Sequence, residues 1–94
     1  MKINVTEEAL QFFKDEMEVE AGQTVRLFAK YGGSTDLTHG FSVGVITEEI
    51  DNAVVETNAD GIRFVVAEQD EWLFQGQDVN VEIRGDEVVF VQAD

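Results

Sequence analysis

The residues best suited to chemistry lie in one stretch, from Tyr31 to Gly44, with the sequence YGGSTDLTHGFSVG. It combines adjacent glycines, hydroxyl side chains, an aspartate and the only histidine of the chain. Polar side chains can contact a ligand, and adjacent glycines allow backbone dihedrals and close approaches that other residues do not. We therefore predict a binding site in this loop. Its expected members are Gly32, Gly33, Ser34, Thr35, Asp36 and His39.

His39 and Asp36, together with Ser34 or Ser42, are also the residue types of a hydrolytic triad. They lie within a few positions of one another on one loop, and the sequence has no G-x-S-x-G elbow. One histidine and no cysteine disfavour a zinc or iron site, and no segment follows the spacing of a calcium loop. We expect no catalytic residue, no enzymatic activity, no metal site and no cofactor.

The charge of the chain restricts its partners. Its 94 residues include 6 Lys or Arg and 20 Asp or Glu, for a formal net charge of −14. Such a surface repels nucleic acids and anionic membranes, so we expect neither as a partner. No apolar run is long enough to span a bilayer, and the N-terminus lacks the pattern of a signal peptide, so we expect a cytoplasmic protein. Without cysteine there is no disulfide and no thiolate.

Hydrophobic periodicity predicts the elements that position the loop. Thr6 can cap a helix that we expect to run from Glu7 to Glu20, with Gly22 as its stop. The expected strands are 2–5, 24–31, a segment from Phe41, NAVVE and IRFVVA joined by the turn NADG, and a final hairpin of DVNVEI and VVFVQ. A short helix is expected in EQDEWLFQG. We predict one domain, residues 1–94, of the α+β class, mostly strands, with an N-terminal helix and a short second helix.

The same periodicity predicts which side chains are buried. The expected core includes Leu10, Phe13, Leu27, Phe41, Val43, Phe64 and Val81. Alternation along the strand 24–31 also assigns Tyr31 to the buried face, and helical spacing assigns Val19 to the margin of the first helix. Trp72 and Phe74 lie in an acidic segment. The core is the default for both, and an interface is the alternative, so we treat them as possible interface residues.

The order of several short motifs resembles a known family. INVTEEAL, VRLFAKYGGS, GFSVGV, ADGIRFVVAEQDEWLFQG and VNVEI resemble the HesB and IscA-like family of A-type iron-sulfur carriers or scaffolds, and especially its HesB/YadR/YfhF-type subgroup. The resemblance spans nearly the whole chain and implies a small HesB-like fold. In typical members a cysteine follows the paired glycines and a Cys-Gly-Cys lies in the tail. Here Ser34 stands in the first position, and the chain ends in Gln92-Ala93-Asp94.

The resemblance implies a member of the iron-sulfur cluster biosynthesis family that holds no cluster. We expect an accessory protein that binds other proteins, including proteins of iron-sulfur assembly. The alternative is a small-molecule or metal-ion binding module that uses the loop 32–42. Family members form dimers or tetramers, whereas a charge of −14 opposes self-association, so we expect a monomer or a weak homodimer.

Overall fold

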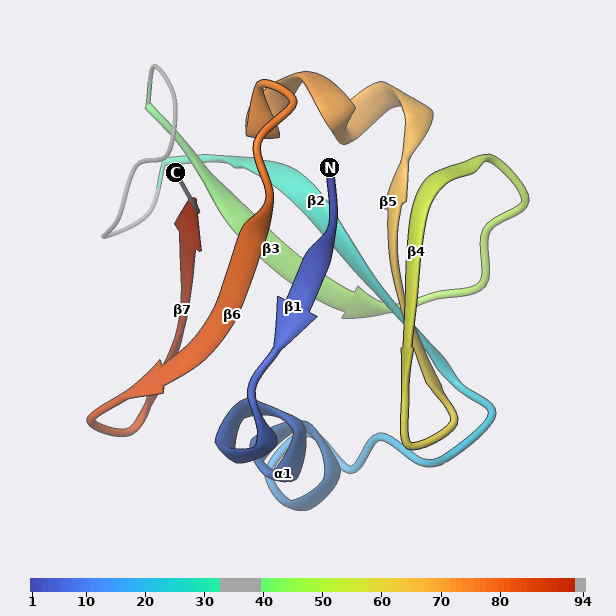
Figure 1. Ribbon diagram of the computed structural model, residues 1–94, viewed down its shortest axis with the longest axis vertical. Coiled ribbons are helices and arrows are strands. Elements are labelled where there is room, and N and C mark those ends of the chain that lie inside the picture. Colours follow the sequence, from blue (N-terminus) through green and yellow to red (C-terminus); the bar gives the residue numbers. More distant parts are fainter. Residues whose placement is uncertain (33–39, 93–94) are drawn as a thin grey trace.

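The computed structural model describes residues 1–32 and 40–92, which form two mixed β-sheets and two short helices (Figure 1). The strands are β1 (Ile3–Val5), β2 (Thr24–Tyr31), β3 (Phe41–Thr47), β4 (Ala53–Ala59), β5 (Ile62–Ala67), β6 (Val79–Arg84) and β7 (Glu87–Gln92). The helices are α1 (Glu7–Asp15) and the 3₁₀ helix η1 (Glu68–Phe74). The predicted α+β class, with mostly strands, an N-terminal helix and a short second helix, is confirmed.

Each sheet combines parallel and antiparallel pairs. One has the order β1-β6-β7, in which β1 is parallel to β6; the other has the order β3-β2-β5-β4, in which β2 is parallel to β5. The hairpins β4–β5 and β6–β7 lie where the turn signals predicted them. The helix α1 covers one end of the strands and η1 covers the opposite end (Figure 1). Neither helix of the described residues has the length and apolar character needed to cross a membrane.

The helix α1 begins as predicted and ends early. Thr6 caps it by accepting a hydrogen bond of 3.1 Å from the backbone N–H of Ala9. The predicted end at Glu20 is wrong, because the helix stops at Asp15 and Glu18 adopts a φ of 56°. The N–H of Val19 then donates to the carbonyl of Phe13 at 3.0 Å, and the Val19 side chain is buried. Val19, predicted at the helix margin, is buried instead, and its burial redirects the chain before Gly22.

The core lies between the two sheets and α1. Of the predicted core, Leu10, Phe13, Leu27, Phe64 and Val81 are buried, whereas Phe41 and Val43 are only partly buried. The assignment of Tyr31 to the buried face is wrong, because 82% of its surface is exposed. The strand β2 is buried at its beginning and exposed at its last two residues, so it extends past the core. Alternation along a strand cannot show where the opposite layer ends.

Candidate functional site

The structure locates only one member of the predicted loop site. Gly33, Ser34, Thr35, Asp36 and His39 lie outside the described residues. Gly32 has a φ of 82°, and its N–H donates to the carbonyl of Gly40 at 2.7 Å. The hydroxyl of Ser42 donates to the Gly32 carbonyl at 2.6 Å. These bonds join the two chain ends that border residues 33–39, and the binding role of the loop stays a prediction.

A row of aromatic side chains lies beside these joined ends. Tyr31 ends β2 and Phe41 begins β3; the two are opposite each other in the strand register, and their ring centroids are 5.5 Å apart. The Phe41 ring is 5.1 Å from the ring of Trp72 on η1. Both contacts are edge-to-face, the geometry that aromatic quadrupoles favour, with interplanar angles of 77° and 89°. We call Tyr31, Phe41 and Trp72 the aromatic face.

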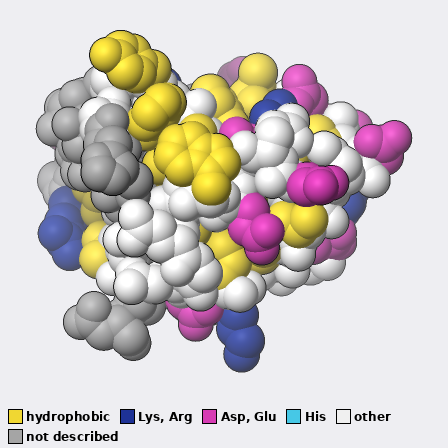
Figure 2. Space-filling view, turned by 90° about the horizontal axis from the view of Figure 1, so that it is seen from above, with side chains coloured by type: hydrophobic (Ala, Val, Ile, Leu, Met, Phe, Trp, Pro, Cys, Tyr) yellow, Lys and Arg dark blue, Asp and Glu magenta, His cyan; other side chains and the backbone are white. Residues whose placement is uncertain are grey.

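The aromatic face is accessible to a partner. Tyr31 is 82% exposed and Trp72 is 48% exposed, while Phe41 between them is half-buried. Figure 2 shows hydrophobic side chains gathered on the end of the molecule that carries η1. Tyrosine and tryptophan dominate the residues that contribute most to protein–protein affinity, since they bury a large area at a small cost in side-chain entropy. The face therefore has the composition and exposure of a protein-binding surface.

Buried neighbours hold Trp72 in place. Leu73 and Phe74, which follow it in η1, have no exposed surface. A 3₁₀ helix has about three residues per turn, so consecutive residues point to different sides and Trp72 faces away from the core. Of the two possible interface residues named from the sequence, Phe74 belongs to the core and only Trp72 reaches the surface. An interface role for Trp72 stays a prediction.

An ion pair fixes η1 to β2. The Asp70 carboxylate, 6% exposed, accepts a bond of 2.7 Å from Nη2 of Arg26 and one of 3.2 Å from the N–H of Ala29. Nη1 of Arg26 donates to Glu48 at 2.7 Å. The hydrogen bond to Asp70, followed by the one to Glu48, raises the pKa of Arg26, so the guanidinium stays charged. Sequence analysis missed this pair, because its members belong to different elements and neither position has a distinctive pattern.

A glycine shapes the surface next to this pair. Phe28 on β2 is opposite Gly44 on β3, and the guanidinium of Arg26 lies over the Phe28 ring at 5.8 Å from its centroid. A Cβ atom on residue 44 would lie 2.5 Å from Cζ of Phe28, closer than real contacts allow. The absence of a side chain at Gly44 therefore provides the space that the Phe28 ring occupies. That ring in turn packs against the guanidinium of Arg26 as a cation–π partner.

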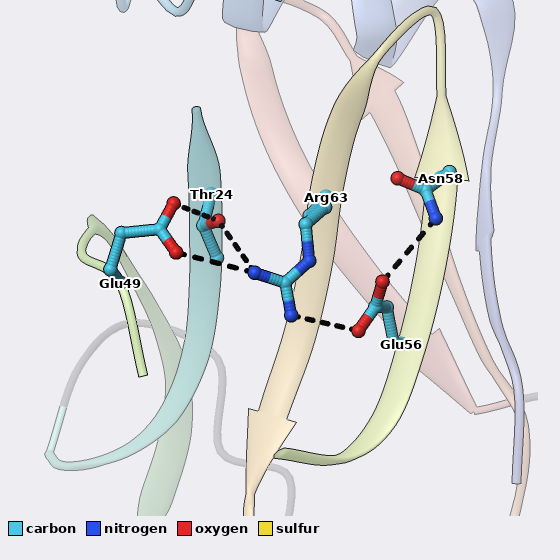
Figure 3. A network of polar contacts seen from close by, with 5 residues as sticks. All are labelled: Thr24, Glu49, Glu56, Asn58 and Arg63. Atoms are coloured by element: carbon cyan, nitrogen blue, oxygen red, sulfur yellow. Dashed lines mark hydrogen bonds and ion pairs between the residues drawn. The ribbon is translucent and has the colours of Figure 1, made fainter. Parts of the chain in front are cut away.

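A second arginine network extends across β2, β5 and β4 of this sheet (Figure 3). Arg63 on β5 donates to Glu56 on β4 at 2.8 Å and to Glu49 at 3.2 Å. Its bond to Glu56 raises the pKa of Arg63 and, in return, lowers the pKa of Glu56. Thr24 and Asn58 complete the network: the Thr24 hydroxyl donates to Glu49 at 2.6 Å, and the Asn58 amide donates to Glu56 at 3.4 Å. One guanidinium pairs with two carboxylates, so the network keeps an excess of one negative charge and offers no free cation to a ligand.

Metal ligands do not converge in the described part of the chain. Residues 1–32 and 40–92 contain no group of three or more His, Cys, Asp or Glu side chains that could hold a metal ion. The exposed aromatic face is the candidate functional site.

Sequence comparison identifies relatives along nearly the whole chain. A Bacillus subtilis protein named pyruvate dehydrogenase inhibitor is 39% identical over 92 residues, which are 96% of this chain and 97% of that protein. An uncharacterised protein of Staphylococcus aureus strain USA300 is 34% identical over 95 residues, with the same two coverages. An uncharacterised protein of Staphylococcus haemolyticus is 34% identical over 85 residues, or 87% of this chain and 86% of that protein. No family model matches the sequence.

These relatives overturn the identification with the HesB and IscA-like family. None of the relatives described above has a name that refers to iron-sulfur biosynthesis, so the predicted cluster-free iron-sulfur accessory protein and its iron-sulfur assembly partners are wrong. The alternative of a small-molecule or metal-ion binding module finds no support in them either. The motifs behind the resemblance have structural causes here: Gly44 makes room for Phe28, and Asp60 and Gly61 have the positive φ angles of a two-residue hairpin turn.

Proposed function

This chain belongs to the family of the Bacillus subtilis pyruvate dehydrogenase inhibitor, and we propose that it too binds a pyruvate dehydrogenase and lowers its activity. The observation that carries this proposal is the extent of the match, because 39% identity extends over 96% of this chain and 97% of the relative. A match of this extent leaves no separate domain of the relative in which its inhibitory activity could lie. We further propose that the protein acts by binding and is not an enzyme.

The aromatic face supports this proposal from the structural side. Inhibition by a small protein requires a surface that stays bound while substrate is present, and such affinity comes mainly from a few large side chains. Trp72 and Tyr31 are exposed, and Phe41 and the buried residues of η1 hold Trp72 in a fixed orientation. A preformed surface loses little entropy on binding. We propose that Trp72 is the central anchor and that Tyr31 extends the contact.

The test is a titration of purified pyruvate dehydrogenase from the source organism with the intact protein, with enzyme activity and binding measured on the same samples. We expect activity to fall to a plateau as the sites fill. Trp72→Ala should weaken binding by about 30-fold, equivalent to about 2 kcal/mol, and Tyr31→Ala by a smaller factor. Circular dichroism would verify that both variants are folded.

Matched controls come from the other exposed hydrophobic side chains. Ile46 and Val54 are 44% and 46% exposed, fractions similar to the 48% of Trp72. Neither residue belongs to the aromatic face. Ile46→Ala and Val54→Ala should leave affinity within about twofold of the unmodified protein. Unchanged enzyme activity at saturating protein would contradict the proposed function. Equal losses in the controls and in Trp72→Ala would keep the function and reject the aromatic face as its surface.

A further inference from the structure

We infer that the aromatic face docks into an apolar recess of the partner protein that is bordered by Lys or Arg side chains. The inference rests on the proposed function and specifies the chemistry of the partner surface. It follows from the charges that surround the aromatic face, from how the charges of the rest of the molecule are paired, and from what a second copy of the same chain would offer instead.

Carboxylates border Trp72 and are free to meet a partner. Glu68 begins η1 and Glu71 directly precedes Trp72, and both are exposed. In contrast to the carboxylate of Asp70 between them, which is bonded to Arg26, neither carboxylate forms an ion pair or hydrogen bond within the described part of the chain. Figure 2 shows Asp and Glu side chains next to the hydrophobic ones on this face. An exposed aromatic centre with a charged border is the usual arrangement of a protein interface.

The cations of the described residues do little to offset this border. Lys14, Arg26, Arg63 and Arg84 each pair with a carboxylate of their own chain. Lys2 and Lys30 are exposed and form no ion pair within the described part of the chain, and Lys30, next to Tyr31, adds one positive charge near the face. Against a net charge of −14, these two lysines leave the potential around the face negative.

The charge also decides between possible occupants. A second copy of this chain would bring the same carboxylates against Glu68 and Glu71, and like charges that face each other across an interface cost free energy. A partner with Lys or Arg around an apolar recess would neutralise these carboxylates while the recess removes Trp72 from water. The same charges would also steer the encounter, since electrostatic complementarity acts chiefly on the association rate.

Association kinetics of the unmodified protein with purified pyruvate dehydrogenase provide the test. Between about 0.05 and 0.5 M NaCl we expect the association rate constant to fall about tenfold or more, because salt screens exposed charges. The double variant Glu68→Gln, Glu71→Gln should associate about threefold or more slowly at low salt and at an unchanged rate at high salt. Its matched control is Asp86→Asn, Glu87→Gln, which removes the same charge from the β6–β7 turn and the first residue of β7, at the opposite end of the molecule (Figure 1).

Asp86→Asn, Glu87→Gln should slow association by less than half as much as Glu68→Gln, Glu71→Gln. An association rate constant that does not change with salt, or that falls equally in both double variants, would overturn the inference and leave the proposed function intact. A homodimer of the unmodified protein that Trp72→Ala dissociates, seen by sedimentation, would overturn it by identifying the second copy as the occupant. Absence of any binding to the enzyme would overturn the proposed function and this inference together.

Discussion

Two arginines on neighbouring strands of one sheet have similar partners and different surroundings. Arg26 on β2 and Arg63 on β5 each donate hydrogen bonds to two carboxylates. Asp70, the main partner of Arg26, has a side chain that is 8% exposed, and the Arg26 side chain itself is 19% exposed. The partners of Arg63 are 67% and 41% exposed, and Arg63 is 31% exposed. Water therefore competes far more effectively for the second network than for the first.

The two networks also connect different pairs of secondary-structure elements. Arg63 links β5 to β4, which are already joined by a backbone ladder, so its loss leaves the strands paired. Arg26 links β2 to η1, and η1 carries Trp72 and has no backbone ladder of its own. Similar numbers of hydrogen bonds thus have unequal consequences. An ion pair matters most where it is shielded from water and where nothing else holds the two elements at the same place.

The largest effect is expected for Asp70→Ala. The change leaves the Arg26 guanidinium with Glu48 alone and the Ala29 N–H without its acceptor. We expect the free energy of unfolding to fall by about 2 to 3 kcal/mol, at the low end for a broken ion pair because Arg26 keeps some contact with water. Urea denaturation followed by far-ultraviolet circular dichroism measures this loss.

Trp72 is the only tryptophan, so its fluorescence reports on η1 separately. In Asp70→Ala we expect the fluorescence transition to precede the circular dichroism transition, because η1 detaches before the sheets unfold. Asp70→Asn keeps a polar side chain of the same shape and should lose less stability. Coincident transitions together with an unchanged midpoint would show that the other contacts of η1, such as the burial of Leu73 and Phe74, hold it without Asp70, and the contrast between the two arginines would disappear.

An intermediate effect is expected for Gly44→Ala. The new Cβ would displace the Phe28 ring, and with it the support that this ring gives to the Arg26 guanidinium. Phe28 is partly exposed and can rotate toward water, so we expect a loss of about 1 kcal/mol in the free energy of unfolding. Phe28→Leu in the Gly44→Ala background should remove the overlap and recover only part of the loss, because leucine has no ring to support Arg26. A stable Gly44→Ala protein with no such loss would mean that the Phe28 ring contributes nothing to the Arg26 network.

Local signals in the sequence were sufficient for much of the fold. Thr6 before an amphipathic segment located the start of α1, and the turn at Asp60-Gly61 located the hairpin β4–β5. Such signals act between near neighbours and depend on residue type alone. They failed for the end of α1, because burial of Val19 in the tertiary core overrode a helical pattern that continues to Glu20.

The candidate site was harder to predict than the fold. The aromatic segment at Trp72 could be noticed, but which of Trp72 and Phe74 faces water depends on the turn of a 3₁₀ helix. Tyr31 follows a strict alternation and still lies beyond the opposite layer. Arg26 and Asp70 are 44 positions apart, and no periodic pattern relates residues at that distance. The contacts that assemble the aromatic face are thus the ones that a single sequence does not encode locally.

A small effect on stability is expected for Arg63→Gln. The substitution removes bonds to two exposed carboxylates, and exposed ion pairs contribute little because water and salt compete for both partners. We expect the urea midpoint to shift by far less than in Asp70→Ala, and the fluorescence and circular dichroism transitions to remain coincident. A shift as large as that of Asp70→Ala would contradict the view that exposure separates the two networks.

The smallest effect is a change in the titration of Glu56. The hydrogen bond from Arg63 holds the pKa of this carboxyl below its ordinary value of 4.5, and a weaker contribution comes from Asn58. Because the folded-state pKa is lowered, the stabilisation is fully present above the ordinary pKa and is lost as the pH falls through the folded pKa.

Carbon-detected nuclear magnetic resonance of the Glu56 side-chain carboxyl should show a pKa below 4.5 that rises in Arg63→Gln and rises less in Asn58→Ala. Because Glu56 and Arg63 are exposed, the stability of the whole protein should scarcely depend on this titration. A Glu56 pKa that does not move in Arg63→Gln would show that the ion pair does not persist in solution, and would widen the difference between the two arginines.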